Sequence, residues 1–297
     1  MKFIEKNEIV DIIGATAKVG VGNSCAEPQT LLDAILESKE HFTKLDLYGM
    51  IQYWSKRFIE CNKDGKFRLN VFMVDRFTYK GIKDGSTRYI PCRYSEIPRL
   101  FYERYIPLDT ALLSVSPPDS KGNCSFGVSC DFSNAMATSA KTVIAEINHR
   151  MPRVHGENFI NRKQIDFAIE TDRALPQVSP RVLSEKDRLI AKHTVELIED
   201  GATIQIGIGR LSEAVLEELY DRKNLGVHSG LLSDGIVGLV KKGVVDNSQK
   251  GLNNGKTVTT TIIGTEQLFA FVDDNDDILS YPCDYTHNQV TLAGVNR

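Results

Sequence analysis

The chain has 297 residues, of which 41% are hydrophobic and 25% are charged, and its net charge at pH 7 is −3. These values are typical of a folded globular protein and argue against a basic nucleic-acid-binding surface or a disordered chain. No apolar run is long enough to span a bilayer, and the N-terminus lacks the apolar core of a signal peptide, so we expect a soluble cytoplasmic protein.

The six cysteines are scattered and form no CxxC pair. In a cytoplasmic chain this pattern favours reduced thiols over disulfides or a zinc site. They are Cys25, Cys61, Cys92, Cys124, Cys130 and Cys283.

The first strand signal lies at residues 15–22, ATAKVGVG, which alternate and end in Gly20-Val21-Gly22. An apolar helical pattern follows over Gln29 to Leu36, after Pro28. The same order of strand, GxG loop and helix recurs at Ile206-Gly207-Ile208-Gly209. The repetition suggests two related α/β lobes, although two common strand-loop-helix units could also match by coincidence.

The middle of the chain contains further elements of both kinds. We expect strands at Phe67 to Val74, Leu112 to Val115 and Thr142 to Ile147, with short helices at Leu100 to Tyr105 and from about Asn134. Residues 79–86, YKGIKDGS, are polar and contain two glycines, so we expect a turn region there.

A proline-punctuated segment, Leu175 to Pro180, marks the predicted boundary between a lobe of residues 1–178 and a lobe of residues 179–297. Ser184 and Asp187 then form a capping-box pattern ahead of an amphipathic helix. The expected fold class is therefore α/β with two lobes.

Residues 202–234 form the most informative stretch of the second lobe. Thr203 to Ile208 resemble a buried strand, Gly207 and Gly209 make a sharp turn, and an apolar stripe from Leu211 to Leu219 indicates a helix. Leu225 to His228 predict another strand, which runs into Ser229-Gly230. A glycine loop at a helix N-terminus favours a phosphate or carboxylate, although the motif alone is common in α/β proteins.

The remaining pattern predicts a helix beginning near Ser233-Asp234, a strand at Val258 to Ile263 and a helical turn at Glu266 to Phe271. The acidic run Asp273 to Asp277 could hold a hard cation, but a solvated loop is the simpler interpretation.

Several common chemistries find no support in these patterns. Ser212 stands where the dinucleotide fingerprint has its third glycine, which disfavours a nicotinamide dehydrogenase. No GxSxG is present. His193 and His228 have no metal-ligand partner at suitable spacing, so we interpret both as core or hydrogen-bonding histidines and expect no metal site.

Five separated segments together resemble the acetyl-CoA hydrolase/transferase family, in particular its 4-hydroxybutyrate and butyryl-CoA:acetate CoA-transferase branch. They occur in the family's order, and the resemblance covers nearly the whole chain. The segments are YIPCRYSEIPRLF (89–101), LSVSPPDSKGNCSFGVSCD (113–131), GATIQIGIGRLSEAVL (201–216), GVHSGLLSDGIVGLVKKGVV (226–245) and PCDYT (282–286).

The resemblance implies two CoA-transferase lobes and transfer of coenzyme A from an acyl-CoA to a short carboxylate such as acetate, butyrate or 4-hydroxybutyrate. In the family a glutamate attacks the thioester, and a carboxylate nucleophile preserves the thioester's energy. Coenzyme A would be a substrate and not a permanently bound cofactor. The match assigns CoA binding to Gly207, Ile208, Gly209, Arg210 and Leu211, and it suggests a homodimer or a larger oligomer.

Two departures qualify this expectation. The family's nucleophilic glutamate follows a pattern like H-[ST]-E, whereas this chain has Gly230 after His228-Ser229. The resemblance also implies that the second lobe is incomplete at Arg297. An acyl-CoA hydrolase with Glu213 or Asp234 positioning water, a non-catalytic CoA-binding relative and a fragment without activity of its own therefore stand beside the transferase.

Overall fold

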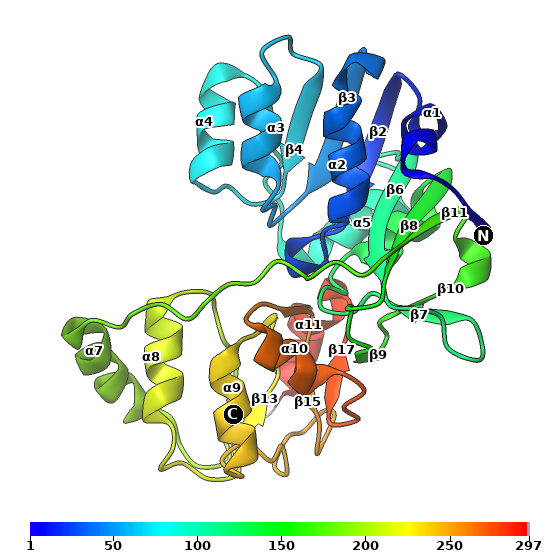
Figure 1. Ribbon diagram of the computed structural model, residues 1–297. Helices are drawn as coiled ribbons and strands as arrows, with labels where there is room; N and C mark the ends of the chain where they lie inside the picture. The colour runs from blue at the N-terminus through cyan, green and yellow to red at the C-terminus, as the bar shows by residue number, and fades with distance from the viewer. Residues whose placement is uncertain (296–297) are drawn as a thin grey trace. The chain divides into compact units, whose positions relative to one another are not determined.

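Eight parallel strands form the main sheet of the first unit, in the order β1-β11-β8-β6-β2-β3-β4-β5 (Figure 1). The computed structural model describes residues 1–295. The described residues form two compact units, residues 1–151 with 159–176 and residues 152–158 with 177–295. The strands are β1 Lys2–Phe3, β2 Thr16–Val21, β3 Lys44–Gly49, β4 Phe67–Val71, β5 Thr87–Tyr89, β6 Thr110–Val115, β8 Thr142–Asn148 and β11 Phe167–Thr171.

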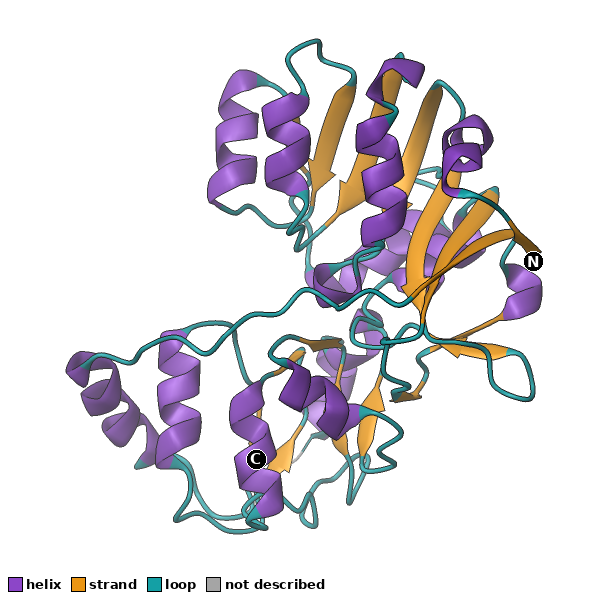
Figure 2. Cartoon of the chain, viewed as in Figure 1, coloured by secondary structure: helices purple, strands orange, loops and turns teal. Residues whose placement is uncertain are grey.

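Helices of the first unit pack along this sheet, and an apolar cluster lies mainly between β2–β4 and the helices α1 to α3 (Figure 2). The buried side chains of that cluster include Leu31 and Ile35 from α2 and Leu45 and Leu47 from β3. The helices are α1 Ile9–Ile13, α2 Gln29–Glu37, α3 Ser55–Cys61, α4 Arg76–Asp84, α5 Ile97–Tyr102 and α6 Ser133–Ser139, and an antiparallel pair joins β7 Asn123–Ser125 to β10 Phe159–Asn161. Short 3₁₀ turns span Lys6–Glu8, Ser24–Ala26, Lys39–His41, Tyr94–Glu96 and Arg162–Gln164.

The turn expected at residues 79–86 is wrong, because α4 occupies most of it. Asp75 caps this helix by accepting hydrogen bonds from the amides of Phe77 (2.8 Å) and Thr78 (2.7 Å), and Gly85 ends it with φ +83°. The glycine at 81 is needed because a Cβ there would lie 2.2 Å from Thr87 Oγ1. Capping at both ends therefore outweighs the turn-like composition.

The second unit also contains parallel strands, but most have only two or three residues. β12 Thr203–Ile204 pairs with β13 Gly226–Val227, His228 bridges to Val258, and β15 Thr257–Thr259 continues through β17 Ile278–Ser280 to β9 His155–Gly156. A further pair joins β14 Leu231–Leu232 to β16 Thr261–Ile262. The helices are α7 Glu185–Val195, α8 Arg210–Glu218, α9 Asp234–Lys241, α10 Glu266–Val272, α11 Cys283–Thr286 and α12 Gln289–Gly294.

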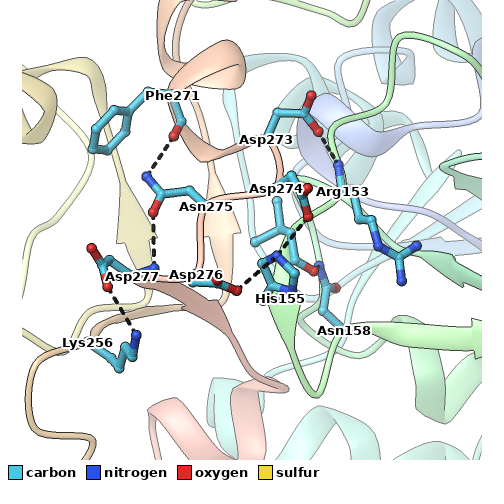
Figure 3. Close-up of polar contacts among 11 residues, drawn as sticks. Arg153, His155, Asn158, Lys256, Phe271, Asp273, Asp274, Asn275, Asp276 and Asp277 are labelled. Carbon is cyan, nitrogen blue, oxygen red and sulfur yellow. Dashed lines mark hydrogen bonds and ion pairs between the residues drawn. The ribbon is translucent and has the colours of Figure 1, made fainter. Parts of the chain in front are cut away.

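The acidic run after α10 holds residues 152–158 within the second unit (Figure 3). Asp273 accepts a hydrogen bond from the Arg153 amide (2.7 Å), and His155 Nε2 lies 3.0 Å from Asp274 Oδ1 and 3.5 Å from Asp276 Oδ1. Lys256 Nζ lies 3.0 Å from Asp277 Oδ1. The run is therefore a structural anchor as well as a surface loop.

The α/β class is confirmed by these parallel sheets, and Ser184 and Asp187 form the expected capping box at α7. Within residues 1–295 no helix is long and apolar enough to cross a membrane.

Candidate functional site

The predicted CoA-binding loop lies between β12 and α8, at the carboxyl end of its strand. Gly209 is the N-cap of α8 with φ +138°, and no side-chain hydrogen bond caps this helix. Apart from Gly209 and its chain neighbours, no heavy atom of the described residues lies within 4 Å of the position that a Cβ on Gly209 would take. The helix therefore presents uncapped amides and its positive dipole end beside an open backbone, which suits an anionic or strongly polarised oxygen.

The other loop residues leave an accessible, partly apolar surface. Ile208 and Leu211 are 58% and 43% exposed, and Arg210 Nε lies 3.7 Å from Asp187 Oδ2 of α7. A cavity of about 310 Å³ opens beneath this loop, lined mainly by apolar side chains that include Ile206, Leu211 and Val215.

Ser229 connects this loop to the end of β13. Its buried hydroxyl accepts a hydrogen bond from the Ile206 amide (2.9 Å), donates to the Ile206 carbonyl (3.1 Å) and accepts from the Leu231 amide (3.2 Å). The strand expected over residues 203–208 ends at Ile204 because this side chain replaces the neighbouring backbone as the partner of Ile206. Ser229 therefore fixes the backbone at Ile206 relative to the turn at residues 229–231.

Gly230 follows Ser229, and the imidazole of His287 fills the space beside it. A Cβ on Gly230 would lie 2.1 Å from His287 Cε1 and 2.3 Å from Nε2. The Thr286 hydroxyl lies 3.0 Å from His287 Nδ1, and burial lowers the pKa of the His287 imidazole. The position that the resemblance assigns to a nucleophile therefore carries no side chain, and a neutral imidazole lies in its place.

His228, two residues before Gly230, lies close to Lys250 and to the ring of Tyr285. His228 is 2% exposed, and burial, assisted by the Lys250 ammonium, lowers its pKa to about 4. Its ring centroid is 6.0 Å from that of Tyr285. Lys250 donates to the carbonyls of Val227 (2.7 Å) and Lys256 (2.6 Å), and burial lowers its pKa to about 8.

The two expected histidines thus have different surroundings. His228 belongs to the core, as predicted, whereas His193 does not, because its side chain is 79% exposed and lies 3.7 Å from Glu196. The apolar face expected for this helix is wrong, because Leu189 and Ile190 are exposed like His193 and the buried residues of α7 are Ala191 and Val195. Within the described residues there is no group of three or more His, Cys, Asp or Glu side chains that could hold a metal ion.

Glu213 and Asp234 line one small pocket of about 60 Å³ together with Ile208 and Gly209, which has room for a few water molecules. Burial raises the pKa of Glu213, and the neighbouring Asp234 adds to the effect. Asp234 accepts hydrogen bonds from the Thr265 amide (3.0 Å) and hydroxyl (2.5 Å) at the start of α10. Glu213 is therefore the less constrained carboxyl of the two.

The structure brings together residues that sequence reasoning did not connect. His287 and Lys250 belong to no recognised motif, and their spacing from Gly230 carries no periodic signal. Only the PCDYT segment just before His287 hinted that this part of the chain contributes to the site.

Comparisons with known proteins agree with this architecture. The model of the acetyl-CoA hydrolase/transferase N-terminal domain matches residues 1–179. The 4-hydroxybutyrate coenzyme A transferase of Clostridium kluyveri is 38% identical over 291 residues, which cover 98% of this chain and 68% of that protein. The chain belongs to the acetyl-CoA hydrolase/transferase family.

Other family members match over the same extent. The butyryl-CoA:acetate CoA-transferase of Anaerostipes caccae is 28% identical, with 99% of this chain and 68% of that protein covered. The crystal structure of RipA from Yersinia pestis gives a TM-score of 0.91 at 30% identity, and covers 99% of this chain and 71% of that chain. A 4-hydroxybutyrate CoA-transferase from Porphyromonas gingivalis gives 0.83 at 31% identity, covering 100% of this chain and 71% of that one. The chain therefore spans about two thirds of the length of these relatives.

Proposed function

We propose that this chain binds short-chain acyl-CoA thioesters at the Gly207–Leu211 loop and cleaves them with water as the acyl acceptor. Family membership and the uncapped N-terminus of α8 support the choice of ligand. The relatives' names include acetate, butyrate and 4-hydroxybutyrate, so we take short carboxylates as the acyl groups. We further propose that the chain forms a homodimer or a larger oligomer.

The observation that carries hydrolysis is the His287 imidazole in the space beside Gly230. Transfer in this family needs a carboxylate that captures the acyl group, and residue 230 has none. An imidazole that is neutral at pH 7 can instead act as a general base. In the tautomer whose Nδ1–H donates to Thr286 Oγ1, Nε2 carries the lone pair that accepts a proton.

In the proposed hydrolysis, His287 activates water for attack on the thioester. Water loses a proton to His287 Nε2, and its oxygen forms a bond to the thioester carbonyl carbon. The amides at the start of α8 stabilise the carbonyl oxygen as its negative charge develops. The C–S bond then breaks, and the thiolate receives the proton from the imidazolium, which yields a carboxylic acid and free coenzyme A.

A purified-protein assay tests this function with acetyl-CoA, following thiol release and the exchange of labelled acetate separately. We expect thiol release without exchange, and His287→Ala should slow the release by roughly 100-fold, the usual contribution of a general base. Gln289→Ala, an exposed neighbour on α12, is the matched control. Unchanged thiol release in His287→Ala would contradict the proposed base, and binding without release or exchange would favour a non-catalytic CoA-binding protein.

Isothermal titration calorimetry on variants of two glycines with positive φ tests the binding of coenzyme A. Gly209→Ala forces an alanine into φ +138° inside the loop, whereas Gly255→Ala forces one into φ +73° in another turn of the same unit. We expect CoA affinity to fall at least tenfold in the first variant only. Equal affinities would place the CoA site elsewhere.

A second candidate is CoA transfer through Glu213. The observation in its favour is that Glu213 lines the pocket beside Gly209 and is half-buried. Exchange of labelled acetate by the native chain, with a CoA adduct mapped by mass spectrometry to Glu213 and lost in Glu213→Gln, would support it. Gly230→Glu combined with His287→Ala should gain exchange, because the imidazole no longer blocks the new carboxylate, whereas Gly230→Glu alone should gain less.

A further inference from the structure

The second unit repeats the strand order of one half of the first unit's sheet. In the first unit β2, β3, β4 and β5 are neighbours in that order, and in the second unit β12, β13, β15 and β17 follow in the same way, with the His228–Val258 bridge between β13 and β15. A helix precedes each series, α1 before β2 and α7 before β12. The GxG loops Gly20-Val21-Gly22 and Gly207-Ile208-Gly209 align the two first strands. Strand β12 is therefore the counterpart of β2.

The two strands differ in what lies on their other side. Strand β2 is also paired with β6, where Val19 to Val21 are in register with Thr110 to Leu112 and the Gly22 amide donates to the Leu112 carbonyl (2.8 Å). Strand β12 pairs with β13 and, within the described residues, with no other strand. The second unit thus has the counterparts of β2 to β5, and the place of β6 beside β12 is open.

The backbone on this open side has free hydrogen-bonding groups. The Ile204 carbonyl accepts a hydrogen bond from the His228 amide (3.1 Å), so the backbone of Ile204 faces β13. Because backbone groups alternate in direction along a strand, those of Gln205 and Gly207 face away from β13. Both residues are exposed, and their backbones make no hydrogen bond within the part of the chain that the structure describes.

The helices that precede the two strands show the same difference. In α1, Ile9 and Ile13 are buried in an apolar cluster that also contains Leu112 of β6. In α7, the apolar residues Leu189 and Ile190 are 53% and 39% exposed. The counterpart of β6 is thus missing from the position where it would cover these side chains.

An apolar cavity of about 310 Å³ lies at the same place, between α7, β12 and α8 (Figure 1). Ile198 from the end of α7, Ile204 from β12 and Val215 from α8 are among the residues that line it. Ordered water needs polar partners, so apolar side chains fill such a cavity better than water does.

We propose that the open side of β12 is a docking edge for a parallel strand of another polypeptide segment, whose apolar side chains fill the cavity beside α7. Paired strands satisfy each other's amides and carbonyls, and apolar pockets select the side chains. The occupant that fits is the third of the relatives' length that has no counterpart in this chain. Since 291 residues make up 68% of the Clostridium kluyveri protein, this third is longer than residues 110–171, which supply β6, β8 and β11 in the first unit.

A second copy of this chain fits the edge less well. Two β12 strands related by a two-fold axis would pair in an antiparallel manner, whereas β2 and β6 are parallel. The proposal concerns the assembly of the second unit and does not depend on the proposed hydrolysis.

Coexpression tests this docking edge. The probe is the part of the Clostridium kluyveri 4-hydroxybutyrate coenzyme A transferase that lies outside the match, produced with an affinity tag beside this untagged chain. We expect the tagged probe to capture the chain in a stoichiometric complex, identified by mass spectrometry after gel filtration. Coenzyme A is absent from the assay, so failure of the hydrolysis proposal would leave this result unchanged.

A proline at residue 205 tests the backbone pairing. Gln205→Pro removes an amide that faces the open side and keeps the pairing of β12 with β13. We expect capture to fall at least roughly tenfold, because the incoming strand loses a hydrogen bond and meets the proline ring. Gln205→Ala is the matched control, since it removes the side chain and keeps the amide, and it should be captured like the native chain.

A charge on α7 tests the apolar contact. Leu189→Glu should reduce capture at least roughly tenfold, because docking would bury an unpaired carboxylate. Val290→Glu on α12 introduces the same charge at an apolar residue that is 82% exposed, and it should leave capture unchanged. Both side chains are exposed in the chain alone, so neither change should alter its thermal unfolding temperature.

A fusion of the probe to the end of this chain gives a second readout if the separate probe does not fold. Amide hydrogen exchange at Gln205 and Gly207 should then slow at least roughly tenfold relative to the chain alone. The absence of both capture and slower exchange would overturn the proposal. Capture that survives both Gln205→Pro and Leu189→Glu would also overturn it, as would a dimer of the chain alone that Gln205→Pro dissociates, because the edge would then belong to a second copy.

Discussion

The carboxyl edges of the two sheets are built in different ways. In the first unit, strands such as β3 and β8 are paired by backbone ladders over five or more residues, and side chains such as Asn23 and Asp131 link the loops that follow the strands. In the second unit, β12 and β13 pair over two residues, and the side chains of Ser229, Asn247 and Lys250 bind the backbone that the short ladder leaves free. Side chains therefore replace part of the backbone ladder in the second unit, whereas in the first unit they only connect loops that follow longer ladders.

The largest expected effect compares two buried serines. Ser229→Ala removes a hydroxyl that makes three hydrogen bonds, and we expect it to lower the free energy of unfolding by about 4 kcal/mol, because Ile206 and Leu231 lose their partner. Ser114→Ala in β6 removes a hydroxyl without a partner in the described residues and should change it by less than about 0.5 kcal/mol. Urea unfolding measures both. Equal losses would show that the two edges do not differ in this way.

A second expected effect is a loss of stability at alkaline pH that comes from Glu27 in the first unit. The pKa of Glu27 is raised from 4.5 to about 8, so the unfolded chain releases this proton at lower pH than the folded one. Stability from this group is complete below pH 4.5 and is lost as the pH rises to 8. Glu27→Gln should therefore gain about 4 kcal/mol of stability relative to the native protein as the pH rises from 4.5 to 8. Thermal unfolding from pH 5 to pH 9 measures the difference, and parallel curves would contradict the assigned pKa.

A smaller expected effect is a loss of stability at acidic pH that comes from His228 in the second unit. The pKa of His228 is lowered from 6.5 to about 4, so between these pH values the unfolded chain binds a proton that the folded chain does not bind. Stability from this group is complete above pH 6.5 and is lost as the pH falls to 4. His228→Gln should remove this loss, which amounts to about 3 kcal/mol for the native protein between pH 7 and pH 4. His193→Gln, on the exposed face of α7, is the control and should follow the native curve.

The local patterns of the sequence were sufficient for much of this molecule. Alternation and helical periodicity determined the α/β class, the sites of β2, α2, β6 and α8, and the capping box at Ser184, because these signals depend on neighbouring residues alone. The recognised segments also led to the family. They did not predict α4, since its Asp75 cap lay outside the polar segment that was read as a turn.

The tertiary structure alone decided the surroundings of Gly230 and Glu27. The sequence shows that residue 230 has no carboxylate, but only folding places the His287 ring in the space beside Gly230. Glu27 reads as an ordinary acidic residue, and its proton is retained because distant segments bury it while Asp33 engages the nearby arginines. Periodicity and capping act between neighbours along the chain, whereas desolvation and occupied volume depend on residues that are far apart in sequence.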